Sequence, residues 1–134
     1  MKKRMQLDDD GYCFACGKKN TRGLRLDFRS ENGGTAAEFL PQKEHQGFRD
    51  IVHGGIIATV LDEAMVKAML SKGLQAVTAE LTVRFKSPLL TGEAATVEAG
   101  LTNPVGRVVE ASARMKKRDG TVVAEARAKL LKNG

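Results

Sequence analysis

The chain has 134 residues, a net charge of +6 and 42% hydrophobic residues. This length fits one domain over residues 1–134 with a sizeable core. No apolar run approaches the roughly 18 residues that a membrane span needs. Five Phe, one Tyr and no Trp offer few rings for stacking on bases. The composition therefore counts against a membrane protein and against a nucleic-acid-binding module.

The N-terminal residues 1–11 are expected to form a flexible extension of the domain. They include basic residues, but no apolar segment follows, so we expect no signal peptide and a cytoplasmic protein. The two cysteines, Cys13 and Cys16, are then expected to be free thiols. The excess of positive charge is scattered along the chain, which is typical of a solvated surface and also suits attraction of a phosphorylated small molecule.

Alternation of apolar and polar residues predicts six strands in chain order. The first two, LRLDF and TAAEFL, flank the turn SENGG, and the other four follow a helical segment. Asp-Gly at 119–120 predicts a hairpin between the last two strands. The predicted strands are 24–28, 35–40, 77–86, 94–101, 108–117 and 122–131.

One helix is predicted, over residues 55–71, with Gly73 as its terminator. The order of elements is therefore β-β-α-β-β-β-β. Strands with one apolar and one polar face form an antiparallel sheet that is packed on one side, and the single apolar helix must cover that side. The prediction is an α+β hotdog fold, a curved antiparallel sheet of about six strands wrapped around one long central helix.

A narrow polar stripe interrupts the apolar surface of this helix. Glu63 and Lys67 are four residues apart and can form an ion pair on the surface. Asp62 has no such partner, because Met65 and Val66 occupy the positions three and four residues later. An unpaired carboxylate near a buried face costs several kcal/mol unless its surroundings compensate, so Asp62 is a candidate functional residue.

Two glycines, Gly54 and Gly55, start the helix and allow another group to approach its first turn closely. The free N–H groups there attract a carbonyl oxygen that is becoming negative. Gly55 and Asp62 share a helix face but lie roughly 10 Å apart along the axis. A two-fold dimer in which Gly55 of one subunit faces Asp62 of the other would bring both to one substrate.

Three motifs together resemble the hotdog acyl-CoA thioesterases. They are HGG followed after six residues by an acid, the segment TAELTVRFKSPLLTGE, and the upstream segment CFACGKKNTRGLRLDF. The most similar subgroup contains phenylacetyl-CoA thioesterase and the 4-hydroxybenzoyl-CoA thioesterases with a helix-borne acid. The resemblance covers roughly residues 12–131.

The resemblance implies a role for each matching residue. Asp62 matches the acid that activates water or attacks the thioester, and Gly55 matches the glycine whose N–H polarises the carbonyl. Thr78 matches a hydroxyl residue that orients the water. Gln46 is the residue nearest to the position before HGG where the family often has an Asn or Gln that assists the thioester carbonyl. His53 matches the histidine of HGG, which shapes the site; a purely structural histidine is the alternative.

The expected substrate is an acyl- or aryl-CoA, hydrolysed to the free acid and CoA without metal or cofactor. Gly54 and Glu63 are expected in the substrate site. Arg84, Lys86 and Arg107 could meet the CoA phosphates, or be ordinary exposed strand residues. A homodimer, or two dimers forming a tetramer, is expected, with no nucleic acid and no membrane as partner.

Two alternative functions follow from the same residues. A non-catalytic acyl-CoA-binding protein would keep the pocket without the chemistry, and a hydratase or dehydratase would need a histidine opposite the acid, with only His45 and His53 available.

The Cys13-x-x-Cys16 pair can bind zinc or form a disulfide, but a structural zinc site needs about four ligands. A structural turn near the pocket mouth is the favoured interpretation of that segment.

Overall fold

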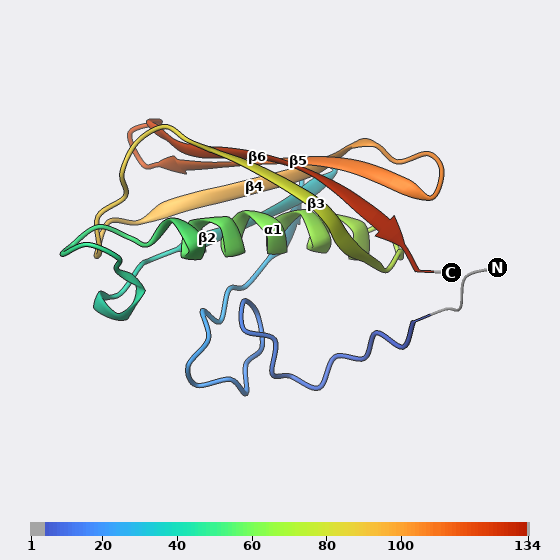
Figure 1. Cartoon of the computed structure of the whole chain (residues 1–134), viewed down its shortest axis with the longest axis horizontal. Coiled ribbons are helices and arrows are strands. Elements are labelled where there is room, and N and C mark those ends of the chain that lie inside the picture. Colours follow the sequence, from blue (N-terminus) through green and yellow to red (C-terminus); the bar gives the residue numbers. More distant parts are fainter. Residues whose placement is uncertain (1–4, 134) are drawn as a thin grey trace.

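The sheet and helix form the α+β hotdog arrangement, as a computed structural model of residues 5–133 describes it (Figure 1). The order β-β-α-β-β-β-β is confirmed. The elements are β1 (Arg29–Glu31), β2 (Gly34–Phe39), a 3-10 turn η1 (Lys43–His45), α1 (Gly54–Leu70), β3 (Ala76–Phe85), β4 (Ala95–Asn103), β5 (Val108–Lys117) and β6 (Val122–Lys132). None of the helices in the described part of the chain is long and apolar enough to cross a membrane.

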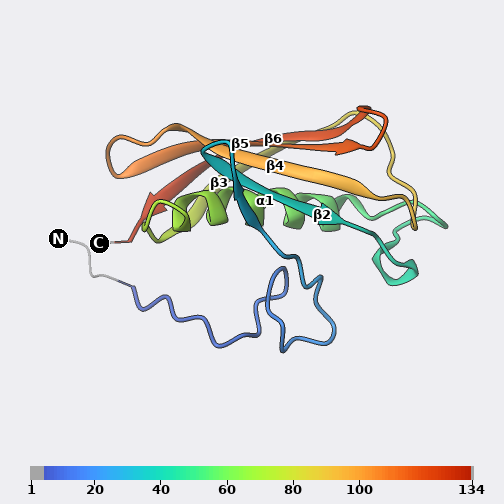
Figure 2. The same cartoon turned by 180° about the vertical axis from the view of Figure 1, so that it is seen from behind.

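The six strands form one sheet in the order β1-β2-β4-β5-β6-β3, and every neighbouring pair is antiparallel. Helix α1 lies along one face of this curved sheet, as Figure 2 shows from the opposite side. The core forms between them from alternate strand residues and from α1, with Val60, Leu61 and Met65 fully buried. Among the described strands, β3 pairs only with β6, so its other edge is open.

Helix α1 begins and ends within one residue of the predicted bounds. Its N-cap is His53, whose Nδ1 accepts the N–H of Gly55 at 2.8 Å. Gly73 follows the helix with φ of 77°, a left-handed conformation that suits glycine. The apolar residues all round α1 are explained by burial on two sides, against the sheet and against the N-terminal segment.

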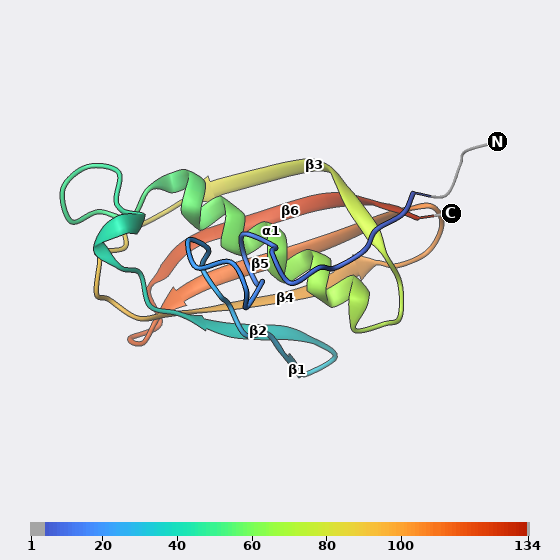
Figure 3. The ribbon, with the colours of Figure 1, turned by 90° about the horizontal axis from the view of Figure 1, so that it is seen from below.

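The N-terminal segment runs across α1 on the side away from the sheet (Figure 3). Ala15 and Leu26 are buried in the core from this side. The N–H of Leu24 donates to the carbonyl of Phe14 at 2.8 Å, and the N–H of Leu26 donates to the carbonyl of Ala15 at 2.9 Å. The predicted strand at 24–28 is therefore wrong: its leucines alternate because they pack below α1, and the first strand begins only at Arg29.

The expected extension 1–11 is only partly within the described residues, since 1–4 lie outside them. The N–H of Met5 donates to Asn133 Oδ1 at 2.8 Å, and Gln75 Nε2 donates to the carbonyl of Leu7 at 3.0 Å. Hydrogen bonds therefore connect the segment after residue 4 to the loop that follows α1 and to the C-terminal end of the sheet.

Both predicted turns are present. Asn32 and Gly33 have φ of 51° and 78° between β1 and β2, as a two-residue hairpin turn requires. Gly120, with φ of 90°, lies between β5 and β6. These turns set the registers of the strands that cover α1.

Candidate active site

The centre of the candidate site is a hydrogen bond between the helix and the edge strand. Thr78 Oγ1 of β3 donates to Asp62 Oδ1 of α1 at 2.6 Å, and both residues are half-buried. The structure thus brings together two of the residues selected from the sequence. The register of β3 shifts between Thr78 and Glu80, so Thr78 faces the helix at the point where the strand bends.

Only one oxygen of the Asp62 carboxylate is engaged in this way. Within the described chain no group donates a hydrogen bond to Oδ2. A carboxylate held at one oxygen keeps the other available to accept a proton from water or to attack an electrophile.

The helix N-terminus forms the second part of the candidate site. Because His53 Nδ1 accepts the Gly55 N–H, that donor is already occupied in the single chain. The N–H of Gly54 has no acceptor among the described residues. His53 thus has the structural capping role that the sequence left open, and the unengaged donor belongs to the neighbouring glycine.

Phe85, which the sequence pattern predicts only as a strand residue, also lies here. A side-chain carbon added to Gly54 would be 3.4 Å from the Phe85 ring, and Phe85 is 53% exposed. An exposed aromatic beside a free N–H offers an apolar wall next to a polar anchor. Strand alternation alone gives no signal for this placement, which depends on how β3 crosses the start of α1.

Gln46 lies in the loop that leads into α1. It pairs with Val52 in an isolated antiparallel bridge, and its Oε1 accepts the N–H of Asp50 at 3.0 Å. His53 N–H donates to the carbonyl of His45 at 2.9 Å, so this loop folds back on the helix start. The side-chain amide of Gln46 therefore lies near the N-terminus of α1. Its Nε2 group donates to no acceptor among the described residues.

The two parts of the site are separated within one chain. Asp62 is seven residues after Gly55, or roughly 10 Å along the axis. Thr78 lies with Asp62, whereas His53, Gln46 and Gly54 lie at the helix start. The single chain therefore does not bring the acid and the helix N-terminus to one reacting atom.

Glu63 faces a different side of α1 from Asp62. Its Oε2 lies 4.0 Å from Lys67 Nζ, so the predicted ion pair is present, and the Cys13 thiol approaches the same oxygen at 3.8 Å. Burial and the Glu63 carboxylate raise the pKa of the Cys16 thiol to about 12. Glu63 thus faces the N-terminal segment and does not lie beside Thr78.

The three basic candidates for phosphate binding are not close together in one chain. Arg107 lines a pocket with Lys132 and Gln75 beyond the C-terminal end of α1, and its carbonyl accepts the Lys132 N–H. Lys132 pairs with Ala76 at the start of β3, whereas Arg84 is eight residues further along that strand. At about 3.3 Å per residue, roughly 26 Å separates the two positions.

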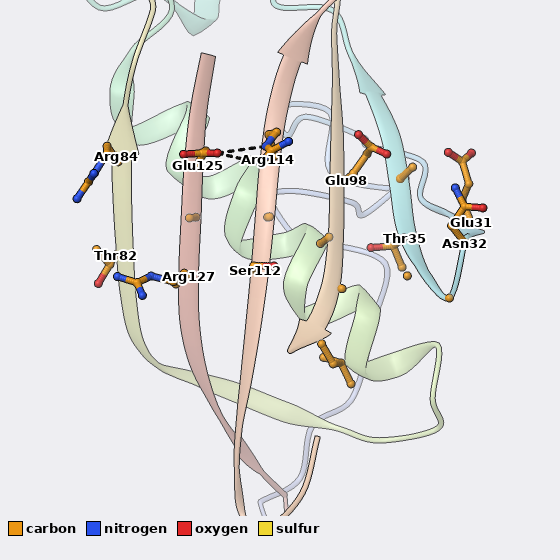
Figure 4. Close-up of a pocket in the computed structure, with 18 residues that line it drawn as sticks. Glu31, Asn32, Thr35, Thr82, Arg84, Glu98, Ser112, Arg114, Glu125 and Arg127 are labelled. Atoms are coloured by element: carbon orange, nitrogen blue, oxygen red, sulfur yellow. Dashed lines mark hydrogen bonds and ion pairs between the residues drawn. The ribbon is translucent and has the colours of Figure 1, made fainter. Parts of the chain in front are cut away.

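Arg84 and Lys86 also lie on the sheet face turned away from α1. Lys86 Nζ is 3.2 Å from Glu125 Oε1, and Arg114 contacts Oε2 of the same carboxylate. Figure 4 shows the broad hollow on this outer face, with Arg84 and Arg127 among its lining residues and α1 behind the strands. This hollow is separated from Asp62 by the sheet.

Comparison with known proteins shows the family and the fold of the chain. The model of the thioesterase superfamily matches residues 50–124, more than half of the chain, and the match contains Asp62 and Thr78. The chain belongs to the thioesterase superfamily. None of the curated proteins matches it.

Solved structures share the fold at low sequence identity. A hypothetical thioesterase from Streptococcus pneumoniae with coenzyme A has a TM-score of 0.77 at 14% identity, covering 81% of this chain and 86% of that one. PaaI of the Escherichia coli phenylacetic acid degradation operon has a TM-score of 0.77 at 23% identity, and the match covers 83% of this chain and 81% of PaaI. A Streptococcus mutans protein bound to acetyl-CoA has a TM-score of 0.77 at 18% identity, and the match covers 81% of this chain and 89% of that one. The hotdog fold predicted from the sequence is confirmed.

Proposed function

We propose that this protein is a cytoplasmic acyl-CoA thioesterase that uses Asp62 and Thr78 to hydrolyse an acyl- or aryl-CoA. The observation that carries the proposal is the 2.6 Å hydrogen bond from Thr78 Oγ1 to Asp62 Oδ1. It holds a half-buried carboxylate in one orientation, with its second oxygen unengaged. A carboxylate so held suits proton transfer or nucleophilic attack at an activated carbonyl.

Hydrolysis then needs few groups. Water attacks the thioester carbon and gives a proton to Asp62, and the tetrahedral oxyanion expels CoA as a thiolate, which takes up that proton. A backbone N–H at the start of α1 stabilises the oxyanion. In the alternative route, Asp62 Oδ2 attacks the carbonyl carbon and the C–S bond breaks, which expels CoA as a thiolate and leaves a mixed anhydride. Water then opens the anhydride to the free acid and the Asp62 carboxylate, and a proton from that water neutralises the thiolate.

We assign the shared site to a homodimer formed along β3. This ten-residue strand has an open edge and exposes Leu81 and Phe85, with 37% and 53% of their surfaces accessible. Open edges favour pairing with a second strand. Two-fold pairing there would place the α1 N-terminus of one subunit near Asp62 of the other. The N–H at that helix start would then serve as the oxyanion donor for the partner's carboxylate.

The neighbouring structures support this substrate class. Two of them contain coenzyme A or acetyl-CoA. Two further structures of the pneumococcal protein carry an Asp-to-Ala and a Thr-to-Ala replacement sixteen positions apart, the same residue types and separation as Asp62 and Thr78. The PaaI likeness makes an arylacetyl group the first acyl class to assay.

Arg107 is our candidate for binding the CoA phosphates. It lies near the C-terminal end of α1. It forms a pocket with Lys132, so two positive groups line one recess. Arg84 and Lys86 of the same chain are not assigned to that CoA, because they lie on the sheet face turned away from α1 and near the other end of β3.

The test is CoA release, followed with a thiol reagent over a panel of aryl and fatty acyl-CoA thioesters. Wild type should turn over at least one of them, and Asp62→Asn should lower kcat by at least about a hundredfold, the scale of losing a general base. A kcat near that of the wild type in the folded variant would remove Asp62 from the mechanism.

The same assay separates the alternative functions. An acyl-CoA-binding protein would bind these thioesters equally well as wild type and as the Asp62→Asn variant, and it would release no CoA from any of them. A hydratase would add water to an enoyl-CoA without forming a free thiol. Either result would replace the thioesterase assignment.

A further inference from the structure

The cysteine turn of the N-terminal segment and helix α1 together form a cluster of three metal-binding side chains. Cys13 Sγ, Cys16 Sγ and a Glu63 carboxylate oxygen all lie within 4.8 Å of one another, and all three residues are half-buried. They are brought together because the segment 11–26 passes across α1 on the side away from the sheet (Figure 3).

The backbone holds the two thiols in place. Gly17 N–H donates to the Cys13 carbonyl at 2.8 Å, and a side-chain carbon on Gly17 would come within 2.5 Å of Cys13 N and of Gly11 O. Ala15, between the cysteines, is buried in the core. The turn is therefore closely packed and directs both sulfur atoms to the same side of α1.

We propose that Cys13, Cys16 and Glu63 bind one thiophilic divalent cation of the zinc class, with water at the fourth position. Tetrahedral zinc, with bonds of about 2.3 Å to sulfur and 2.0 Å to oxygen, holds its ligand atoms roughly 3.5 to 3.8 Å apart. Cys13 Sγ is already 3.8 Å from Glu63 Oε2. Contraction of the cluster by at most about 1.3 Å brings every pair of ligand atoms to these separations.

The charges around the cluster also suit a divalent cation. Two thiolates and one carboxylate carry three negative charges, which the cation and the Lys67 ammonium together neutralise. Lys67 Nζ lies 4.0 Å from Glu63 Oε2 and its side chain is 26% exposed, so it can turn outward while it remains near the site. Neutrality matters because unbalanced charge is costly in a half-buried position.

The histidines considered as further ligands lie elsewhere. Nδ1 of His45 accepts the N–H of Gln42, and Nδ1 of His53 accepts that of Gly55, both near the α1 N-terminus. The site is also separate from the catalytic pair, since consecutive residues Asp62 and Glu63 point about 100° apart on the helix. The cation would connect the N-terminal segment to α1 without contacting the substrate.

The experiment is Co²⁺ and Zn²⁺ titration of the full chain, purified without a tag, reduced and stripped with a chelator. Co²⁺ should bind one per chain with a thiolate-to-cobalt absorption band that Zn²⁺ removes. Cys13→Ser and Cys16→Ser should lose the band, and Glu63→Gln should weaken binding at least about tenfold. Glu110→Gln, an exposed glutamate without an ion pair in the described residues, should bind as wild type does.

A second readout is thermal stability, which needs no substrate and no catalytic activity. A cation that binds only the folded chain raises Tm of the wild type, and it should not raise Tm of Cys13→Ser. Circular dichroism of each variant confirms that it folds.

Two results would overturn the proposal. One is absence of the cobalt band while a thiol assay counts two free cysteines per chain. The other is wild-type affinity in Glu63→Gln, which would leave the two thiols without the third ligand. Protein that carries a Cys13–Cys16 disulfide, and binds no cation after reduction, would assign the pair to thiol oxidation instead.

Discussion

At the scale of single residues, the candidate mechanism depends on how Thr78 positions Asp62. Thr78 does not need to touch the substrate, because its hydroxyl orients the carboxylate through one oxygen. Such positioning is sensitive to small displacements of the reacting groups. Thr78 is therefore a positioning residue, and its removal should affect turnover more than binding.

Replacing Thr78 by Val should lower kcat by roughly tenfold or more, because the carboxylate loses its orienting hydrogen bond. KM should change little, since the hydroxyl is not expected to hold the ground-state substrate. Thr78→Ser should recover most of the rate. Thr82→Val, an exposed position four residues along the same strand, is the control. Equal losses in both valine variants would indicate a general effect on β3.

The Cys16 thiol gives a prediction on reactivity and pH. Because burial and the Glu63 carboxylate raise its pKa to about 12, it stays protonated where an ordinary cysteine ionises. In metal-free protein at pH 8, iodoacetamide should alkylate Cys16 at least about a hundredfold more slowly than in the unfolded chain, as mass spectrometry can measure. Equal rates in the folded and unfolded chain would refute this.

The same shift links Cys16 to stability. The pKa is higher in the folded chain, so the unfolded chain loses its proton first as the pH rises above 9. The contribution of Cys16 to the free energy of unfolding is present below pH 9 and is lost as the pH rises toward 12. Between pH 9 and pH 12, the free energy of unfolding measured with urea should fall less in Cys16→Ala than in the wild type.

At the scale of elements, the fit of β2 against β4 depends on one glycine. Gly34 is buried at the start of β2, and a side-chain carbon there would be 2.1 Å from the carbonyl oxygen of Ala99 in β4. That oxygen belongs to the backbone and cannot rotate away. The adjacent Thr35 hydroxyl donates to the carbonyl of Ala64 at 2.9 Å, so the same region also fixes β2 against α1.

Gly34→Ala should therefore lower the free energy of unfolding by about 2–3 kcal/mol, the scale of an overpacked interior. Gly100→Ala is the matched control, because that position, also in the β2–β4 region, has no atom within 4 Å of an added carbon. It should stay within about 0.5 kcal/mol of the wild type. Urea unfolding measures both, and equal stability of the two variants would contradict the close approach.

At the scale of the whole molecule, the proposed homodimer predicts that two inactive variants can complement each other, because the helix start and Asp62 lie roughly 10 Å apart in one chain. Asp62→Asn and Gly54→Val should each be inactive alone, because a valine side chain at Gly54 would cover the unengaged N–H at the start of α1. Refolded together, half of the dimers are mixed, and each mixed dimer has one intact site, so activity should return to about one quarter of the wild type. CoA release measures the recovery, with mixed dimers verified by mass spectrometry. No recovery would place the complete site within one chain.

Much of the fold could be predicted because its signals are local. Alternation in β3, β5 and β6, the Asn32-Gly33 turn and the apolar helix each follow from neighbouring residues. The false strand at 24–28 arose because apolar residues that pack below a helix alternate just as strand residues do. Alternation reports which side is buried and not what covers it.

The sequence by itself determined the antiparallel sheet, the central helix, the exceptional carboxylate of Asp62 and, through its motifs, the superfamily. Only the tertiary structure decided which side chains meet: Asp62 with Thr78, Glu63 with Cys13 and Cys16, and Gly54 with Phe85. It also separated Arg107 from Arg84. The physical reason is that helix and strand periods depend on local backbone geometry, whereas contacts between distant segments depend on strand order and on which face each segment covers.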